Sequence, residues 1–190
     1  MSDNVYKNKS LKLYLNDLAA RLPAPGGGSA AALCAALGAA LISMVINFTI
    51  GKTKYARHKR QLQKWLVISE KARSEFLNLT DKDVIAYKSK NIKKALGVPL
   101  ELCRKCFEII RLCPELAEKG NINLISDVAV AAVMLEAAFS SGYYNVKINL
   151  GIIRDKVLSR KINKELSRKG KTISKIRLKT EVKVGQIIGR

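Results

Sequence analysis

Three consecutive glycines, Gly26 to Gly28, stand directly before Ser29 and a long uncharged segment that reads as a helix. Glycine loses more conformational freedom on folding than any other residue, so a triplet is best explained where another group must approach bare backbone. The first N–H groups of a helix lack intrahelical acceptors and lie at the positive end of its dipole, which suits a flat or anionic ligand. We therefore predict a ligand site at this helix start; a tight turn between two packed helices is the alternative.

Three aspartates lie in polar, loop-adjacent settings beside predicted buried helices: Asp81, Asp83 and Asp127. An aspartate desolvated in a cleft has its pKa raised toward the range in which it can transfer protons. Asp83 also stands three residues after Thr80, the spacing of a capping-box variant in which the acid satisfies backbone donors. Asp127 has a similar structural alternative as an acid in the first turn of a helix. Spacing alone leaves catalysis and capping both open.

Four asparagines form a second group of candidate ligand contacts. Asn145 and Asn149 are four residues apart and therefore share one face of a helix, whereas Asn121 and Asn123 fall in a predicted loop. Amide groups both donate and accept hydrogen bonds, so they could bind the edge of a heteroaromatic ring. Asparagines in turns are also common for purely structural reasons.

The formal net charge of +20 favours an acidic partner, which leaves nucleic acid, an anionic membrane surface or a polyanionic small molecule. Residues 151–190 contain 13 basic and 3 acidic residues, so the last fifth of the chain is especially basic. The first ten residues are polar and show no export signal, which predicts a cytoplasmic protein. Four cysteines are then expected to remain thiols.

The cysteine pattern predicts a packed helix face. Cys103, Cys106, Ile110 and Cys113 recur at i, i+3, i+7 and i+10 and form one stripe. A zinc site would need a second ligand cluster, and the chain has no other CxxC and one histidine. We predict core thiols and no metal.

Residues 30–50 carry no charge and are long enough to span a bilayer. The segment is rich in alanine and includes Ser43, Asn47 and Thr49, a poor composition for membrane insertion. Bulky residues and small residues form two separate stripes along it, which is typical of a helix that packs closely against neighbours. We predict the central helix of a soluble bundle and no membrane span.

The remaining periodicity predicts an all-α, single-domain helical bundle over residues 1–165 with a short basic tail over 166–190. The expected helices span about residues 10–21, 29–50, 62–79, 80–97, 99–120, 126–141 and 143–164, with Thr80 as an N-cap, Pro99 in a first turn and a break at Gly142. Apolar and charged residues alternate over 176–184, so the tail is predicted to be strand-like. Rossmann and P-loop folds are excluded because their glycine spacing and preceding strand are missing.

Four segments occur in the order of the signature segments of a known family. They read PAPGGGSAAALCAALGAALISMVINFTIGKTKY, DKDVIAY, GNINLISDVAVAA and GYYNVKINL. Over about residues 10–155 the chain therefore resembles the cyclodeaminase/cyclohydrolase family, whose members include the cyclodeaminase domain of formiminotransferase-cyclodeaminase and stand-alone methenyltetrahydrofolate cyclohydrolases. The resemblance implies an all-helical homodimer that binds folate. It also implies that Asp83, in the pattern DxxA[FY] with Tyr87, is the leading catalytic candidate.

On this resemblance the expected reaction is methenyltetrahydrofolate hydrolysis, because no transferase domain accompanies the chain. Formiminotetrahydrofolate cyclodeamination is the alternative, and RNA binding through the basic tail is an alternative of another class. No cofactor beyond the tetrahydrofolate substrate is implied, and Lys52, Lys54 and Arg57 suit a polyglutamate tail. The expected catalytic residues are Asp83 and Asp127, and the expected folate contacts are Gly26, Gly27, Gly28, Ser29, Lys52, Tyr87, Asn121, Asn145 and Asn149.

Overall fold

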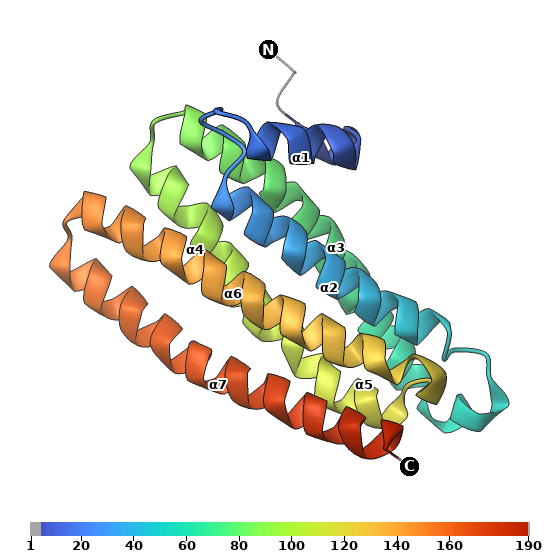
Figure 1. Cartoon of the computed structure of the whole chain (residues 1–190). Helices are drawn as coiled ribbons and strands as arrows, with labels where there is room; N and C mark the ends of the chain where they lie inside the picture. The colour runs from blue at the N-terminus through green and yellow to red at the C-terminus, as the bar shows by residue number, and fades with distance from the viewer. Residues whose placement is uncertain (1–4, 190) are drawn as a thin grey trace.

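The computed structural model describes residues 5–189, which form an all-helical bundle with no strand among them (Figure 1). The α-helices are α1 (Leu11–Ala19), α2 (Gly27–Asn47), α3 (Lys59–Lys88), α4 (Ile92–Ile109), α5 (Cys113–Lys119), α6 (Ile125–Ile153) and α7 (Lys156–Ile188). Short 3-10 turns cover Tyr6–Asn8, Thr53–His58, Ile110–Leu112 and Ile122–Leu124. The predicted all-α architecture is confirmed.

Helix α2 packs between α3 and α6 (Figure 1). Its alanines, including Ala32, Ala35 and Ala39, are fully buried and allow the neighbouring helices to approach closely. By length and composition α2 and the segment Ile122–Ile153 could each cross a membrane, but 61% of the α2 window is already buried inside the bundle. The prediction of a buried alanine-rich helix is confirmed.

Helix α3 runs without interruption from Lys59 to Lys88, so the predicted helix break at Thr80 is wrong. Thr80 is buried, and its hydroxyl donates to the carbonyl of Phe76 one turn earlier rather than capping a new helix. Asp83 therefore has no capping role in its own helix. The apolar face of α3 continues through Leu79 and Val84, which explains why packing keeps the helix intact.

The predicted first-turn position of Pro99 is also wrong, because α4 begins at Ile92 after Asn91 caps the N–H groups of Lys93 and Lys94. A proline inside a helix has no N–H to donate to the carbonyl four residues earlier. Here that carbonyl belongs to Ala95, and the Nδ2 of Asn149 on α6 donates to it at 2.7 Å. A side chain from a neighbouring helix thus replaces the missing backbone bond.

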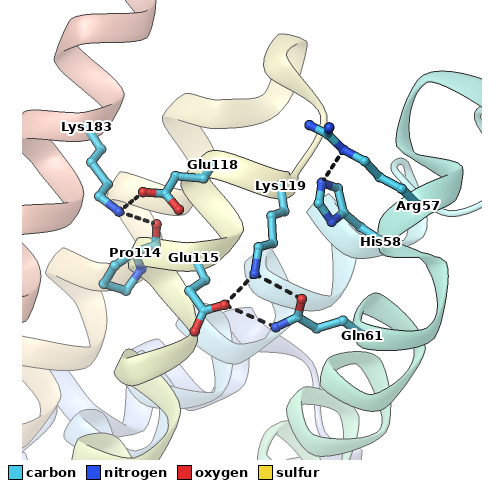
Figure 2. A network of polar contacts seen from close by, with 8 residues as sticks. All are labelled: Arg57, His58, Gln61, Pro114, Glu115, Glu118, Lys119 and Lys183. Atoms are coloured by element: carbon cyan, nitrogen blue, oxygen red, sulfur yellow. Dashed lines mark hydrogen bonds and ion pairs between the residues drawn. The ribbon is translucent and has the colours of Figure 1, made fainter.

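Helix α5 follows α4 after one 3-10 turn, and the predicted end at Gly120 is confirmed. Polar contacts fix α5 on both sides (Figure 2): Lys183 of α7 pairs with Glu118, and Lys119 donates to Gln61 of α3 at 3.0 Å. The three cysteines of the predicted stripe are buried as thiols in the core. The prediction that they pack in the core is confirmed.

Helix α6 continues through Gly142, so the predicted break there is wrong. Gly142 is needed for packing, because a Cβ at this position would lie 3.0 Å from the Sγ of Cys103 and 3.3 Å from a methyl of Leu102. Helices α4 and α6 meet closely at this point. A glycine in a helix interior costs about 0.5–1 kcal/mol relative to alanine, and the close contact accounts for it.

The predicted strand at residues 176–184 is wrong, because these residues belong to the long helix α7, capped by Asp155. Ile173, Thr180 and Val184 are buried at i, i+7 and i+11, whereas Leu178 and Val182 are exposed. The alternating pattern therefore coincides with a helical stripe that packs on α5 and α6. The helix crosses position 165, where the sequence divides the domain from the tail, without interruption.

Candidate active site at the glycine end of the bundle

A pocket of about 230 Å³ opens where α2 begins, and four helices contribute to it. Its lining residues are Pro23, Ala24, Gly26, Gly27, Gly28, Asp83, Tyr87, Ala95, Asn145, Ile148 and Asn149. The glycines come from the start of α2, the acid and Tyr87 from α3, and the two asparagines from α6. The pocket therefore brings together seven of the eleven residues predicted as catalytic or folate-binding.

The carboxylate of Asp83 lies directly against the backbone of Gly28. A Cβ built on Gly28 would stand 2.2 Å from Asp83 Oδ1, so no larger residue fits there without displacing the acid. Gly26 has open space around its Cβ position, and a Cβ on Gly27 would only reach Asn145 Nδ2 at 4.0 Å. The close approach of the Asp83 carboxylate thus explains why residue 28 is a glycine. Gly26 and Gly27 instead leave backbone exposed toward the pocket.

Burial raises the pKa of Asp83 above its ordinary value, and a hydrogen bond from the backbone N–H of Ser29 partly opposes that shift. The first intrahelical bond of α2 runs from Ala30 N to Gly26 O, so the N–H groups of Gly27, Gly28 and Ser29 have no acceptor within the helix. Asp83 is therefore half-buried at the positive end of a helix. Such a carboxyl group is better suited to accept a proton than an exposed aspartate.

The other pocket residues supply amides and an aromatic ring. Asn145 donates to the carbonyl of Ser141 at 3.0 Å, and Asn149 donates to Ala95, so both amides are held by backbone. Tyr87 is exposed at the pocket edge. Ser29 is fully buried beneath the pocket. It does not line the pocket but interacts with Asp83, which does.

Three predicted residues lie at the other end of the bundle. Lys52 is exposed and lines a separate surface hollow with Gly51 and Tyr55, and Asn121 and Asp127 flank the start of α6. Eighteen helical residues separate Asp127 from Asn145, a distance of about 27 Å. These three side chains do not contribute to the pocket of the same chain, and their contact with folate stays a prediction.

Sequence reasoning did not single out Ala95, Ile148 or the buried Tyr14 beside the site. Ile148 adjoins the two asparagines on α6, so the shared helix face was an available signal. Leu11, Leu15, Leu18 and Leu22 recur at helical spacing around Tyr14, yet Tyr14 is the one residue of α1 that is buried. An aromatic residue within a repeat of leucines was the available signal for Tyr14.

The site offers one carboxylate, two amides, a phenol at the rim and the N-terminus of a helix. No group of three or more histidine, cysteine, aspartate or glutamate side chains suited to a metal ion occurs within residues 5–189. This donor set can bind a polar heteroaromatic ligand and move a proton. These groups are of the kind that acid–base enzymes use to transfer protons.

Comparison with known proteins agrees with this class. The family model for formiminotransferase-cyclodeaminase matches residues 10–90 and 88–168, and the chain belongs to that family. The methenyltetrahydrofolate cyclohydrolase of Methylorubrum extorquens is 37% identical, with 84% of this chain and 88% of that protein aligned. The formimidoyltransferase-cyclodeaminase of Rattus norvegicus is 31% identical over 83% of this chain, which spans 34% of that protein.

The fold has a solved counterpart. The crystal structure of formiminotetrahydrofolate cyclodeaminase from Thermotoga maritima matches with a TM-score of 0.90 and 29% identity. The match covers 96% of this chain and 98% of the other.

Proposed function

We propose that this chain is a methenyltetrahydrofolate cyclohydrolase, which converts 5,10-methenyltetrahydrofolate and water into 10-formyltetrahydrofolate. The observation that carries the proposal is the half-buried Asp83, which lies against Gly28 in a pocket lined by Asn145 and Asn149. The relative named for this activity aligns over most of both chains, which supports it. The reaction requires no cofactor besides the folate itself.

The proposed mechanism uses Asp83 first as a base and then as an acid. Its carboxylate takes a proton from water while the water oxygen attacks the carbon that bridges N5 and N10 of the cationic substrate. In the tetrahedral intermediate the bond from that carbon to N5 breaks, and protonated Asp83 delivers its proton to N5. The hydroxyl proton of the intermediate leaves to solvent, which gives the neutral formyl group. Asn145 and Asn149 orient the ring system, and positioned proton transfer of this kind contributes about 10²- to 10⁴-fold.

Formiminotetrahydrofolate cyclodeamination is the second candidate, favoured by the solved structure of that name at a TM-score of 0.90. In that reaction N10 attacks the formimino carbon attached to N5 and passes its own proton to the imino nitrogen. Asp83 then donates a second proton to this nitrogen, which leaves as ammonia and gives the 5,10-methenyl cation. The same acid thus serves both reactions. Purified protein assayed on each substrate separates them: we expect loss of methenyltetrahydrofolate absorbance without ammonia release, and turnover of neither substrate would overturn both assignments.

We also propose that the chain acts as a homodimer through an uncharged face of α6. On one face of this helix the exposed positions recur every three or four residues and carry no charge in a chain of net charge +20, and the exposed Lys147 borders that face. They are Ser126, Val130, Val133, Ala137, Ser141, Tyr144, Ile148 and Ile152. Leu37 and Phe48 extend the apolar face onto the adjacent helix α2.

The size and position of this face suit a second copy of the chain. Two helices about 30 Å long and 10 Å wide each offer roughly 600 Å² in projection, and a stable interface buries about 800 Å² per partner. Ile148 belongs both to this face and to the pocket lining, so a dimer would enclose one side of the pocket.

Oligomeric state provides the test of the dimer. Val133→Lys on the uncharged face should shift the mass measured by light scattering from dimer to monomer. Val67→Lys is the matched control, because Val67 is also an exposed valine but lies on the charged outer face of α3. A wild-type protein that is monomeric at micromolar concentration would refute the dimer.

RNA binding remains the non-enzymatic alternative, supported by a row of exposed cations along α7. They are Lys164, Arg168, Lys171, Lys175 and Lys179. Deleting the tail would not test this, because Leu166, Ile173 and Val184 belong to the core. Replacing the exposed cations with glutamine leaves the core intact, and we expect unchanged folate turnover. Loss of a salt-dependent RNA affinity in that variant would support the alternative.

A further inference from the structure

Helix α1 buries only one of its side chains, Tyr14, which is 4% exposed. Leu11, Leu13 and Leu15 are exposed, whereas Leu18 is half-buried beside Tyr14. The helix lies beside the end of the bundle where α2 begins (Figure 1). Its packing in one chain therefore serves mainly to hold a single phenol there.

Ser29 connects that phenol to the acid of the pocket. The hydroxyl of Tyr14 donates to Oγ of Ser29 at 3.2 Å, and both side chains are buried. The backbone N–H of Ser29 in turn lowers the pKa of Asp83, whose Oδ1 lies 2.2 Å from the Cβ position of the preceding residue, Gly28. Tyr14 does not line the pocket, so it can act on Asp83 only through Ser29.

Residues outside the pocket hold the phenol in place. The ring of Tyr6 packs edge to face on Tyr14 with centroids 5.3 Å apart. The backbone N–H of Tyr6 donates to Asp81 Oδ1 at 2.5 Å, and the Tyr6 hydroxyl donates to Asp17 at 2.9 Å. Asp81, buried in α3, thus ties the start of the chain to the helix that carries Asp83.

We propose that Tyr14 is a positioning residue that acts through Ser29 to fix the carboxylate of Asp83. The inference rests on the proposed function of the pocket. Ser29 is the third residue of α2, and its N–H can hold the carboxylate only while the first turn of that helix keeps its orientation. The Tyr14 hydroxyl bond fixes the Ser29 side chain, and through it that turn. The charge of Asp83 adds to burial in raising the pKa of Tyr14, which places the two groups within electrostatic reach.

The test compares two tyrosines of the same aromatic pair. Tyr14→Phe keeps the ring and removes the bond to Ser29, while Tyr6→Phe keeps its ring and its N–H bond to Asp81 and removes only the bond to Asp17. We expect Tyr14→Phe to lower kcat roughly 5- to 20-fold with KM within about twofold, since small misplacements of catalytic groups are costly. Tyr6→Phe should lose a similar amount of thermal stability at normal kcat.

The pH profile separates positioning from simple loss of stability. The Ser29 N–H lowers the pKa of Asp83, so a loosened Ser29 should let that pKa rise and move the acid limb of kcat/KM to higher pH. Ser29→Ala should show the same shift, and combining it with Tyr14→Phe should add little to either change alone. Equal kcat in Tyr14→Phe and Tyr6→Phe, or additive effects in the double variant, would overturn the proposal.

A measurement that needs no turnover keeps this inference separate from the proposed function. Carboxyl carbon NMR titration reports the pKa of Asp83 directly, and it should shift upward in Tyr14→Phe but not in Tyr6→Phe. If wild-type protein turns over neither folate, the proposed function fails while this readout still decides the role of Tyr14. If folate is turned over and the Asp83 pKa is the same in both variants, only the positioning role fails.

Discussion

The two ends of the bundle contain similar polar residues arranged for different purposes. At the glycine end Asp83 and Asn145 project into a pocket. At the other end Asn121 is 4% exposed and bonded on three sides: its N–H donates to Thr49, its Nδ2 donates to the carbonyl of Phe48, and its Oδ1 accepts from Asn123. The same amide chemistry builds a site at one end and closes a loop at the other.

The type of a residue therefore does not show whether it binds a ligand or stabilises the fold. The open space beside its side chain does. Gly28 leaves room for a carboxylate at the helix start, and Gly120 at the far end instead packs on Leu116 and Val45. From this comparison we expect changes at the glycine end to alter turnover and changes at the far end to alter stability.

The largest effect should come from Asp83→Asn, which keeps the shape of the side chain but removes the proton-transfer group. We expect kcat to fall by on the order of 10² or more, with the fold retained. In wild type, kcat/KM should fall as pH drops through the raised pKa of Asp83, because the base form is lost, and the variant should lack this limb. Near-normal kcat on both folates would remove the catalytic assignment.

Asp127→Asn is the companion change, because Asp127 is the second predicted carboxylate and lies at the far end. A loss comparable to that of Asp83→Asn would place Asp127 in the site of a partner chain and break the contrast between the two ends. Turnover within a few-fold of wild type would support the contrast between the two ends.

The next effect is expected for Gly28→Ala. The new methyl group would collide with the Asp83 carboxylate and displace it, so we expect kcat to fall about 10- to 100-fold. Gly26→Ala is the matched control, since nothing lies within 4 Å of its Cβ position and its backbone is extended. Steady-state kinetics of the two variants should differ by at least tenfold; equal activity would argue against close approach as the role of Gly28.

At the far end Asn121→Ala should affect stability. The change leaves the carbonyl of Phe48 and the N–H of Asn123 without their partner, which costs about 1–3 kcal/mol when such groups are buried. Urea unfolding should show a lower midpoint with unchanged m-value, while kcat stays near that of wild type. A loss of turnover without a loss of stability would contradict the structural assignment of this amide.

The smallest effect concerns Glu165, which lies outside both ends. Arg104, with Lys169, lowers the pKa of Glu165 to about 2, so its ion pairs stabilise the fold above the ordinary glutamate pKa and are lost as pH falls toward 2. Because Arg104 is 46% exposed, we expect only about 0.5–1 kcal/mol. Glu165→Gln should therefore lower the midpoint of urea unfolding at pH 6 and leave it unchanged at pH 2. Folate turnover should be unaffected.

Local patterns predicted the helices well where a single helix face determines the outcome, as in the alanine stripe of α2 and the cysteines of α4 and α5. They failed at Thr80, Pro99 and Gly142, because each residue is compatible with a helix end and only its contact with another helix keeps it in the interior. The strand over 176–184 failed because alternating residues can also satisfy a helical stripe.

For the site, the glycine start predicted a place for a ligand, and family resemblance selected Asp83 from several acids. Neither could show that Gly28 and Asp83 touch, because 55 residues of sequence separate them. Tyr14 was overlooked for the same reason: its partners Ser29 and Asp83 become neighbours only after α1 folds back over α2. Local sequence determines the chemistry available, and tertiary contacts determine which of it is used.

Pro99 has a further consequence for what the pocket can recognise. Because this proline donates no hydrogen bond to Ala95, that carbonyl takes up one of the two N–H groups of the Asn149 amide and fixes the position of the amide in the pocket lining. The amide keeps its second N–H and its oxygen for a ligand. A heterocycle must therefore meet an amide whose position is fixed by α4 and not one that rotates freely. A single proline in α4, which does not itself line the pocket, thus fixes where a ligand can meet this amide.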